Sequence, residues 1–320
     1  MSNDIFVLVE HRDGVVAESA HELLGRARQL AGSSGGEAVA VVFGSGIDAL
    51  AGQLGAASRV LTVDDPSLAQ PTPAAYQAAL VAILRERQPL LALVPNSGIG
   101  MDVAAGASAA TGLPLAAYAT AVEVDGGAPR VTCRIYGGKI DATVRFRDGR
   151  GIATVVTGAF PAAAGQVAGS PPVERVALPA ADSRVRFVAL HRPEAGDVDI
   201  TREAILVSVG RGIGEQENLE IVGELAGALG GAVSSSRPIV DSGWLPRTRQ
   251  VGKSGLRVKP KLYLALGISG APEHLEGMRD AELIVAVNTD PRAPIFGVAH
   301  YGATVDLLDL VPALTRRLAG

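Results

Sequence analysis

Short apolar runs alternate with glycine and small polar residues along the stretch from Gln250 to Asp306. The runs Leu262–Leu266, Leu283–Val287 and Ile295–Ala299 have the length and composition of buried strands, and a glycine or a small polar or chargeable residue follows each one. Parallel strands deliver the loops that follow them to one edge of a sheet. Such an edge presents many backbone N–H groups and short side chains, which suits a large, flat, phosphorylated cofactor.

The composition predicts a globular protein of two domains. The chain has 320 residues, of which 48% are hydrophobic and 19% are charged, and chains of this length commonly divide in two. The formal charge of −4 offers no basic surface to nucleic acid or to an anionic membrane. No apolar run approaches the ~20 residues of a membrane span, and the start MSNDIFVLVEHRDG does not have the form of a secretory signal. We therefore expect a cytoplasmic protein without stable membrane insertion.

Residues typical of disulfides and metal centres are sparse. Cys133 is the single cysteine, so we expect a buried, inert thiol and no internal disulfide. The five histidines form no HxxxH pair, and His191 with Glu194 lies in a proline-containing stretch. The sequence thus predicts no protein-bound metal.

The first half of the chain predicts an α/β core with a β-hairpin extension. Strand-like runs such as Ile5–Val9 alternate with helical patterns such as Pro73–Arg87 as far as residue 111. Four strands then follow one another between turns: Thr120–Val124, Arg130–Ile135, Ala142–Phe146 and Ile152–Val156. We expect these last strands to form antiparallel ribbons.

Residues 162 to 200 are rich in Ala, Gly and Pro, with one strand-like piece at Val185–Leu190. This composition is typical of a crossing between domains. We therefore predict domains at residues 1–195 and 196–320.

The second half restarts the α/β pattern with a strand at Ala204–Val209, the glycine-rich turn GRGIG and a helix at Asn218–Leu229. This order can aim backbone N–H groups at a phosphate. Glu215 stands where a GxGxxG fingerprint needs its third glycine. The turn is therefore either a phosphate-binding loop or a plain tight turn. Arg237, after a short strand at Ala232–Ser236, is similarly either a solvated loop charge or a group at the carboxyl edge of the sheet.

Six segments of the second half together resemble the α subunit of the electron transfer flavoproteins. They are GRGIG at 210–214, SSRPIVDSGW at 235–244, QVGKSG at 250–255, LYLALGISGAPEHLEGM at 262–278, IVAVNTDPRAPIF at 284–296 and YGATVDLL at 301–308. They follow in order and cover nearly all of residues 204–315. In the first half, LVEHRDG and RIYGGKIDATVRF fit less specifically.

The resemblance implies a C-terminal parallel-sheet domain that binds FAD, similar to the deoxyhypusine-synthase-like NAD/FAD-binding folds. It implies an N-terminal domain that packs on a β subunit, which carries AMP, or a second FAD in bifurcating members. Such a heterodimer takes single electrons from flavin dehydrogenases, such as the acyl-CoA dehydrogenases of fatty acid β-oxidation, and passes them to a quinone reductase or another flavoenzyme. It is a carrier and not an enzyme, so the resemblance implies no catalytic residues.

The resemblance also implies which positions contact FAD. They are Arg211, Ser236, Arg237, Gln250, Val251, Gly252, Lys253, Ser254, Ser269, Gly270, Ala271, Pro272, Glu273, His274, Asn288, Asp306 and Leu307. His274 and Arg237, as positive or hydrogen-donating groups beside the isoalloxazine, would favour its reduced states. The hydroxyl of Ser254, where the family usually has Thr, would donate toward the flavin N5 side. Gly267, with its neighbours, would let the backbone close on the cofactor.

Three positions depart from the family pattern. Lys253 stands where the family has Gln, Pro272-Glu273 replaces an Ile-Gln pair, and His300 replaces an Asp. We interpret all three as a shift in the charge balance of the site, and hence in its redox potential or its partner.

Two other classes of function stay open. The departures would also suit a nucleotide-binding structural or regulatory subunit that has lost electron transfer. The order of strand, GRGIG and helix would suit an NAD(P)-binding oxidoreductase domain, although the sequence shows no proton-transfer dyad.

Overall fold

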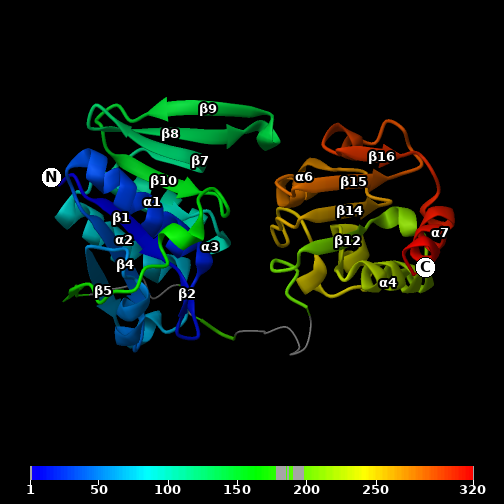
Figure 1. Ribbon diagram of the computed structural model, residues 1–320. Coiled ribbons are helices and arrows are strands. Elements are labelled where there is room, and N and C mark those ends of the chain that lie inside the picture. Colours follow the sequence, from blue (N-terminus) through cyan, green and yellow to red (C-terminus); the bar gives the residue numbers. More distant parts are fainter. Residues whose placement is uncertain (1, 178–184, 186, 190–197, 320) are drawn as a thin grey trace. The chain divides into compact units, whose positions relative to one another are not determined.

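The chain forms two compact units, residues 1–189 and 190–320 (Figure 1). The computed structural model describes residues 2–177, 185, 187–189 and 198–319. The predicted domain boundary near residue 195 lies outside the described residues. The predicted strand Val185–Leu190 lies partly outside them, and its described residues are not in a strand.

The first unit is built on a nine-stranded sheet in the order β11-β5-β4-β1-β6-β10-β7-β8-β9. Strands from β11 to β7 pair in parallel, and β7, β8 and β9 pair antiparallel. The strands are β1 (Ile5–Val9), β4 (Ala38–Gly44), β5 (Arg59–Asp64), β6 (Leu91–Pro95), β7 (Leu115–Asp125), β8 (Ala128–Ile135), β9 (Ile140–Arg145), β10 (Gly151–Val155) and β11 (Val173–Arg175). A separate small hairpin joins β2 (His11–Arg12) to β3 (Val15–Val16).

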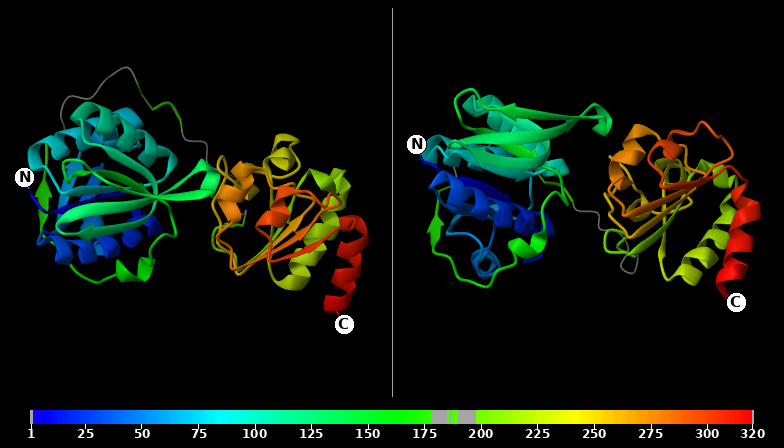
Figure 2. Two further views of the ribbon diagram at one scale, coloured as in Figure 1. Left: turned by 90° about the horizontal axis from the view of Figure 1, so that it is seen from above. Right: turned by 45° about the horizontal axis from the view of Figure 1, so that its top comes forward.

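Helices cover both faces of this sheet. Helix α1 (Glu18–Ser34) packs on one face, and α2 (Pro73–Arg87) and α3 (Gly98–Thr111) pack on the other (Figure 2). Each face has its own apolar core, and β1 is buried along its whole length between them. The α/β core with a hairpin extension is therefore confirmed.

The position of β10 differs from the prediction of consecutive antiparallel ribbons. This strand lies between β6 and β7 and pairs in parallel with both. All its residues are buried, whereas most of β9 is exposed. A strand that is apolar on both faces belongs in the middle of a covered parallel sheet, and the local turn signals before it carry no information on pairing direction.

The second unit is a five-stranded parallel sheet in the order β13-β12-β14-β15-β16. Its strands are β12 (Ile205–Val209), β13 (Ala232–Ser235), β14 (Leu262–Leu266), β15 (Leu283–Val287) and β16 (Tyr301–Ala303), and its helices are α4 (Leu219–Leu229), α5 (Arg237–Asp241), α6 (Pro272–Met278) and α7 (Leu307–Ala319). None of the helices in the described part of the chain combines the length and apolarity that a bilayer crossing needs.

The predicted strand Ile295–Ala299 is wrong. Residues Pro294–Gly297 form a short 3₁₀ helix, and the strand of this region is β16. Pro294 has no N–H for a sheet ladder, and the Ile295 N–H donates to the carbonyl of Ser269 at 3.0 Å. The apolar side chain of Ile295 is still fully buried, so burial alone produced the strand-like pattern.

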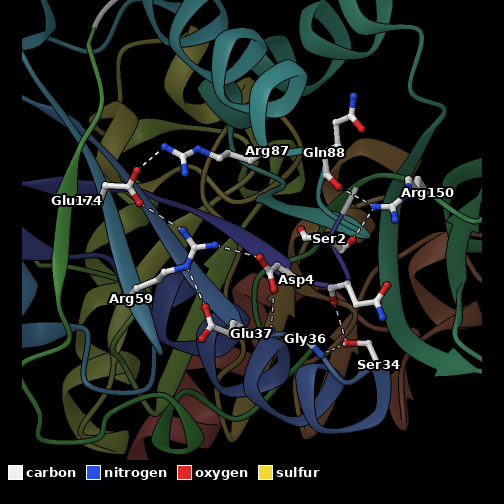
Figure 3. Close-up of polar contacts among 11 residues, drawn as sticks. Ser2, Asp4, Ser34, Gly36, Glu37, Arg59, Arg87, Gln88, Arg150 and Glu174 are labelled. Carbon is white, nitrogen blue, oxygen red and sulfur yellow. Dashed lines mark hydrogen bonds and ion pairs between the residues drawn. The ribbon is translucent and has the colours of Figure 1, made fainter.

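Arg59 joins three carboxylates at the amino edge of the first sheet (Figure 3). Its guanidinium lies 3.0 Å from Asp4, 2.9 Å from Glu37 and 3.5 Å from Glu174. Glu174 of β11 also pairs with Arg87 at the end of α2. One side chain that is 24% exposed thus ties together β1, β4, β5 and the edge strand β11.

Substituting Arg59→Met should lower the free energy of unfolding by about 1–3 kcal/mol, because the partly buried Asp4 and its neighbour Glu37 would lose this counter-charge. The matched control is Arg175→Met, whose pair with Asp48 is exposed on both sides and should matter by less than about 0.5 kcal/mol. Urea unfolding followed by circular dichroism measures both. Equal losses in the two variants would contradict the assignment.

Candidate functional site

A cavity of about 840 Å³ lies at the carboxyl ends of β12, β13, β14 and β15. The loop 250–254 and the first turn of α6 complete its wall. Most of the positions predicted from the resemblance line it. These are Arg211, Ser236, Arg237, Gln250, Val251, Gly252, Lys253, Ser254, Ser269, Ala271, Glu273, His274 and Asn288.

Four predicted positions lie outside the lining: Gly270, Pro272, Asp306 and Leu307. Pro272 is the first residue of α6. A carboxylate oxygen of Asp306 accepts from the Leu308 N–H at 2.8 Å, at the start of α7, while Leu307 is buried in the apolar core. Their contact with a cofactor stays a prediction.

The lining also contains residues that were not among the predicted contacts: Gly212, Pro238, Asp241, Gly267 and Ile268. Gly267 had been expected to allow a close backbone approach. Asp241 could have been found from the sequence, because it stands four positions after Arg237 on the same short helix. Pro238 and Ile268 carry no polar signal in the sequence and enter the wall only through the fold.

The GRGIG turn brings two loops into backbone contact. The Gly212 N–H donates to the carbonyl of Gly267 at 3.0 Å. A Cβ atom added to Gly212 would lie 2.7 Å from the Cα of Gly267, closer than any side chain tolerates. The turn therefore joins β12 to the loop after β14 and places Arg211 at the cavity.

The loop 250–254 is held on two sides. The Val251 N–H donates to the carbonyl of Ser235 at 2.8 Å, and the Lys253 N–H donates to the carbonyl of Glu273 at 2.7 Å. The buried Gln250 donates from Nε2 to the Oγ of Ser254 at 2.9 Å. Because the Ser254 oxygen accepts this bond, its own proton stays available as a donor.

Charged side chains of both signs surround the cavity. Arg211, Arg237 and Lys253 line it together with Asp241 and Glu273, so cations outnumber carboxylates by one. The Nε of Arg237 donates to Asp241 at 3.1 Å, and both side chains are more than half exposed. An exposed pair of this kind contributes only a few tenths of a kcal/mol, about 0.3–0.5, so Arg237 can turn to an anionic ligand at little cost.

His274 is the buried titratable group of the site. It is 6% exposed, and its Nε2 lies 2.9 Å from the hydroxyl of Tyr263. Burial lowers the pKa of His274 to about 4, and the backbone of Val251 only partly opposes this shift. The ring is therefore neutral near pH 7. A neutral imidazole has one N–H and one lone pair, so of the two roles that the sequence left open, that of a cation is excluded.

His300 does not belong to the site, which corrects the interpretation of its departure as a change in the site's charge. Its Nδ1 accepts from the Ile284 N–H at 2.9 Å, beside the starts of β15 and β16. The cavity lies at the opposite, carboxyl end of β15. A carboxylate at this position could accept the same bond, which explains why His can stand where the family has Asp. The described residues contain no group of three or more His, Cys, Asp or Glu that could hold a metal.

Comparison with known proteins identifies the class. The electron transfer flavoprotein domain matches residues 5–181, and the electron transfer flavoprotein FAD-binding domain matches residues 199–279. The chain is 36% identical to the electron transfer flavoprotein subunit alpha of Syntrophomonas wolfei, over 98% of each chain. It is 35% identical to Protein FixB of Clostridium saccharobutylicum, over 97% of this chain and 94% of that one. It is 34% identical to the acryloyl-CoA reductase electron transfer subunit beta of Anaerotignum propionicum, with the same coverage.

The chain therefore belongs to the electron transfer flavoprotein family. Within the family it is an α subunit with an FAD-binding domain, and the resemblance seen in the sequence is confirmed. The cavity fits a flavin: its volume is in the range of cofactor pockets, about 300–1,000 Å³, and three cations that suit an anionic ligand line it.

Substituting Gly277→Ala should weaken FAD binding at least about tenfold, or about 1.4 kcal/mol. An added Cβ would lie 2.4 Å from the backbone nitrogen of Gly252 and would push the 250–254 loop. The matched control is Gly223→Ala, also in a helix, where nothing lies within 4 Å. Fluorescence titration with FAD measures both, and unchanged affinity in Gly277→Ala would contradict the role of this loop.

His274 should titrate near pH 4, since the folded chain disfavours its charged form. Its ordinary pKa is higher, so protonation opposes folding: the stability from the neutral ring is complete above about pH 6.5 and is lost as the pH falls toward 4. An NMR titration of the histidine ring signals measures this, and a His274→Gln variant identifies the signal. Titration near pH 6.5 would contradict the burial of the ring.

Proposed function

We propose that this chain holds one FAD in the cavity at the carboxyl edge of its second sheet and carries single electrons as half of an α/β pair. Electrons arrive from a flavin dehydrogenase, such as an acyl-CoA dehydrogenase, and leave to a quinone reductase or another flavoenzyme. The β subunit holds AMP, or a second FAD in a bifurcating complex. The chain performs no substrate chemistry of its own. The observation that carries the proposal is the convergence of Ser254, His274 and three cations on one cavity in the FAD-binding domain.

The residues that line the cavity differ in what they offer to a bound flavin. The cations Arg211, Arg237 and Lys253 supply charge for an anionic ligand, because guanidinium and ammonium groups pair with phosphate oxygens. Ser254 offers a hydroxyl proton, since Gln250 occupies its oxygen. His274 offers a neutral ring. The flavin supplies the redox chemistry when it is bound, and these residues bind and orient it.

The relatives named above support a range of acceptors and donors. One of them is by name an electron transfer subunit of an acryloyl-CoA reductase. A two-flavin, bifurcating pair is therefore as consistent with this chain as a single-flavin carrier, and the choice depends on the β subunit.

Co-expression with the β subunit and a visible spectrum of the purified pair test the proposal. We expect flavin absorption equivalent to one FAD per pair for a simple carrier and two for a bifurcating complex. Reduction should proceed in two separate one-electron steps. A colourless pair would favour a structural subunit that has lost electron transfer. Hydride exchange with NAD(P)H by this chain alone would favour the oxidoreductase alternative.

Substituting Glu273→Gln should raise the flavin potential by about 20–40 mV. Reduction makes the ring more negative, so removing this exposed carboxylate should stabilise reduced flavin relative to oxidised flavin by about 0.5–1 kcal/mol. The matched control is Glu282→Gln, an exposed acid before β15 that is not among the residues lining the cavity. Potentiometric titration of the loaded pair measures both variants. Indistinguishable potentials in Glu273→Gln and wild type would count against a role for this charge.

A further inference from the structure

A line of polar groups runs from the cavity wall into the apolar core of the second unit. The Nε2 of His274 lies 2.9 Å from the Tyr263 hydroxyl, which in turn donates to the Oγ of Ser208 at 2.6 Å. Tyr263 and Ser208 are both 0% exposed. A buried polar group that loses its partner destabilises the fold, so the three side chains depend on one another.

The direction of these bonds decides where the protons are. A tyrosine hydroxyl has a single proton, and in this line Ser208 receives it. The contact with His274 then needs the proton on Nε2. The neutral ring is therefore the Nε2-protonated tautomer. Its Nδ1 carries a lone pair: the backbone of Val251 lies near the ring, but among the described residues no group is in position to form a hydrogen bond with Nδ1.

We infer that Tyr263, backed by Ser208, is a positioning residue for His274. It fixes the orientation of the imidazole and selects its Nε2-protonated tautomer, which determines where the ring can donate and where it can accept. The effect on a flavin rests on the proposed function, whereas the tautomer is a property of this chain by itself.

Packing alone does not account for the hydroxyl. The ring of Tyr263 lies in an apolar cluster with Met278 and Ile284, where phenylalanine would fill the same space without a buried polar atom. Burial raises the pKa of Tyr263, with Ser208 and Ser234 opposing the shift, so the hydroxyl keeps its proton. Ser208, at the inner end of this line, is fully buried. Among the described residues the line is therefore a fixed support for the imidazole and not a path for protons to solvent.

The tautomer is tested in the full-length chain, with ¹⁵N-labelled histidine, paired with unlabelled β subunit and stripped of flavin. We expect the ¹⁵N shifts of His274 in wild type to show the Nε2-protonated form alone. In Tyr263→Phe the backbone of Val251 is the remaining polar neighbour, so we expect the proton to move largely to Nδ1. The matched control is Tyr76→Phe, which removes another buried hydroxyl, one bonded to the Phe43 carbonyl at 3.0 Å in the first unit. His274→Gln identifies the signal.

The same variants, loaded with FAD, are then compared by potentiometry. We expect Tyr263→Phe to change the ratio of reduced to oxidised flavin at a fixed potential at least about threefold, equivalent to about 30 mV for one electron, and Tyr76→Phe to leave it unchanged. If Tyr263→Phe does not fold, Ser208→Ala replaces it, because it frees the tyrosine proton to turn toward Nε2.

The outcomes separate the two proposals. An unchanged tautomer in Tyr263→Phe and Ser208→Ala would overturn the positioning role. A changed tautomer with an unchanged potential would support the positioning of His274 and overturn its effect on the flavin. A pair that shows the tautomer change but whose wild type binds no FAD would support the positioning of His274 and overturn the proposed function.

Discussion

The site depends on the register of the parallel strands in the second sheet. Val209 of β12 pairs with Leu266 of β14, and Leu266 pairs with Val287 of β15, so the three strands end at one level. The hydrogen bonds between the strands continue one residue into the loops. The Gly210 N–H donates to the carbonyl of Leu266 at 2.8 Å, and the Gly267 N–H donates to the carbonyl of Val287 at 2.9 Å. A slip of one residue would reverse the face of every side chain. Register therefore holds the cavity wall in place.

Two kinds of electrostatic environment meet in this cavity. Arg237 is exposed and paired with its helix neighbour Asp241, so its charge is easily redirected to a ligand. His274 is buried and neutral, so its contribution depends on the direction of its hydrogen bonds and not on a charge. The first environment supplies affinity for an anion, and the second supplies a fixed dipole in a place with little solvent screening.

Local signals in the sequence were sufficient for many elements, and the resemblance to the family named most of the residues that line the cavity. The helix Pro73–Arg87 and the strand Leu283–Val287 have the predicted bounds, because a proline at a helix start and a short β-branched run are local features. Pairing direction is not local, so β10 was placed wrongly. Burial does not distinguish a strand from a 3₁₀ turn, so Ile295–Ala299 was assigned to a strand.

The residues that the sequence missed are those whose role arises only through three-dimensional neighbours. Tyr263 is a buried position in the continuously apolar strand β14, and nothing in the sequence indicates that its hydroxyl meets His274. The reverse error occurred at His300, where proximity in the sequence to site motifs suggested a role in the site, although the residue lies at the other end of its strand. A sequence motif thus predicts reliably which loops come together. It predicts less reliably at which end of a strand a given side chain lies.

A crystal structure of the α/β pair with FAD tests the central claim most directly. The account predicts the isoalloxazine at the carboxyl edge of the second sheet, within hydrogen-bond distance of Ser254 and His274, with the Tyr263 hydroxyl still bonded to the imidazole. Flavin density elsewhere on this chain, or a cavity closed by its own side chains, would contradict it.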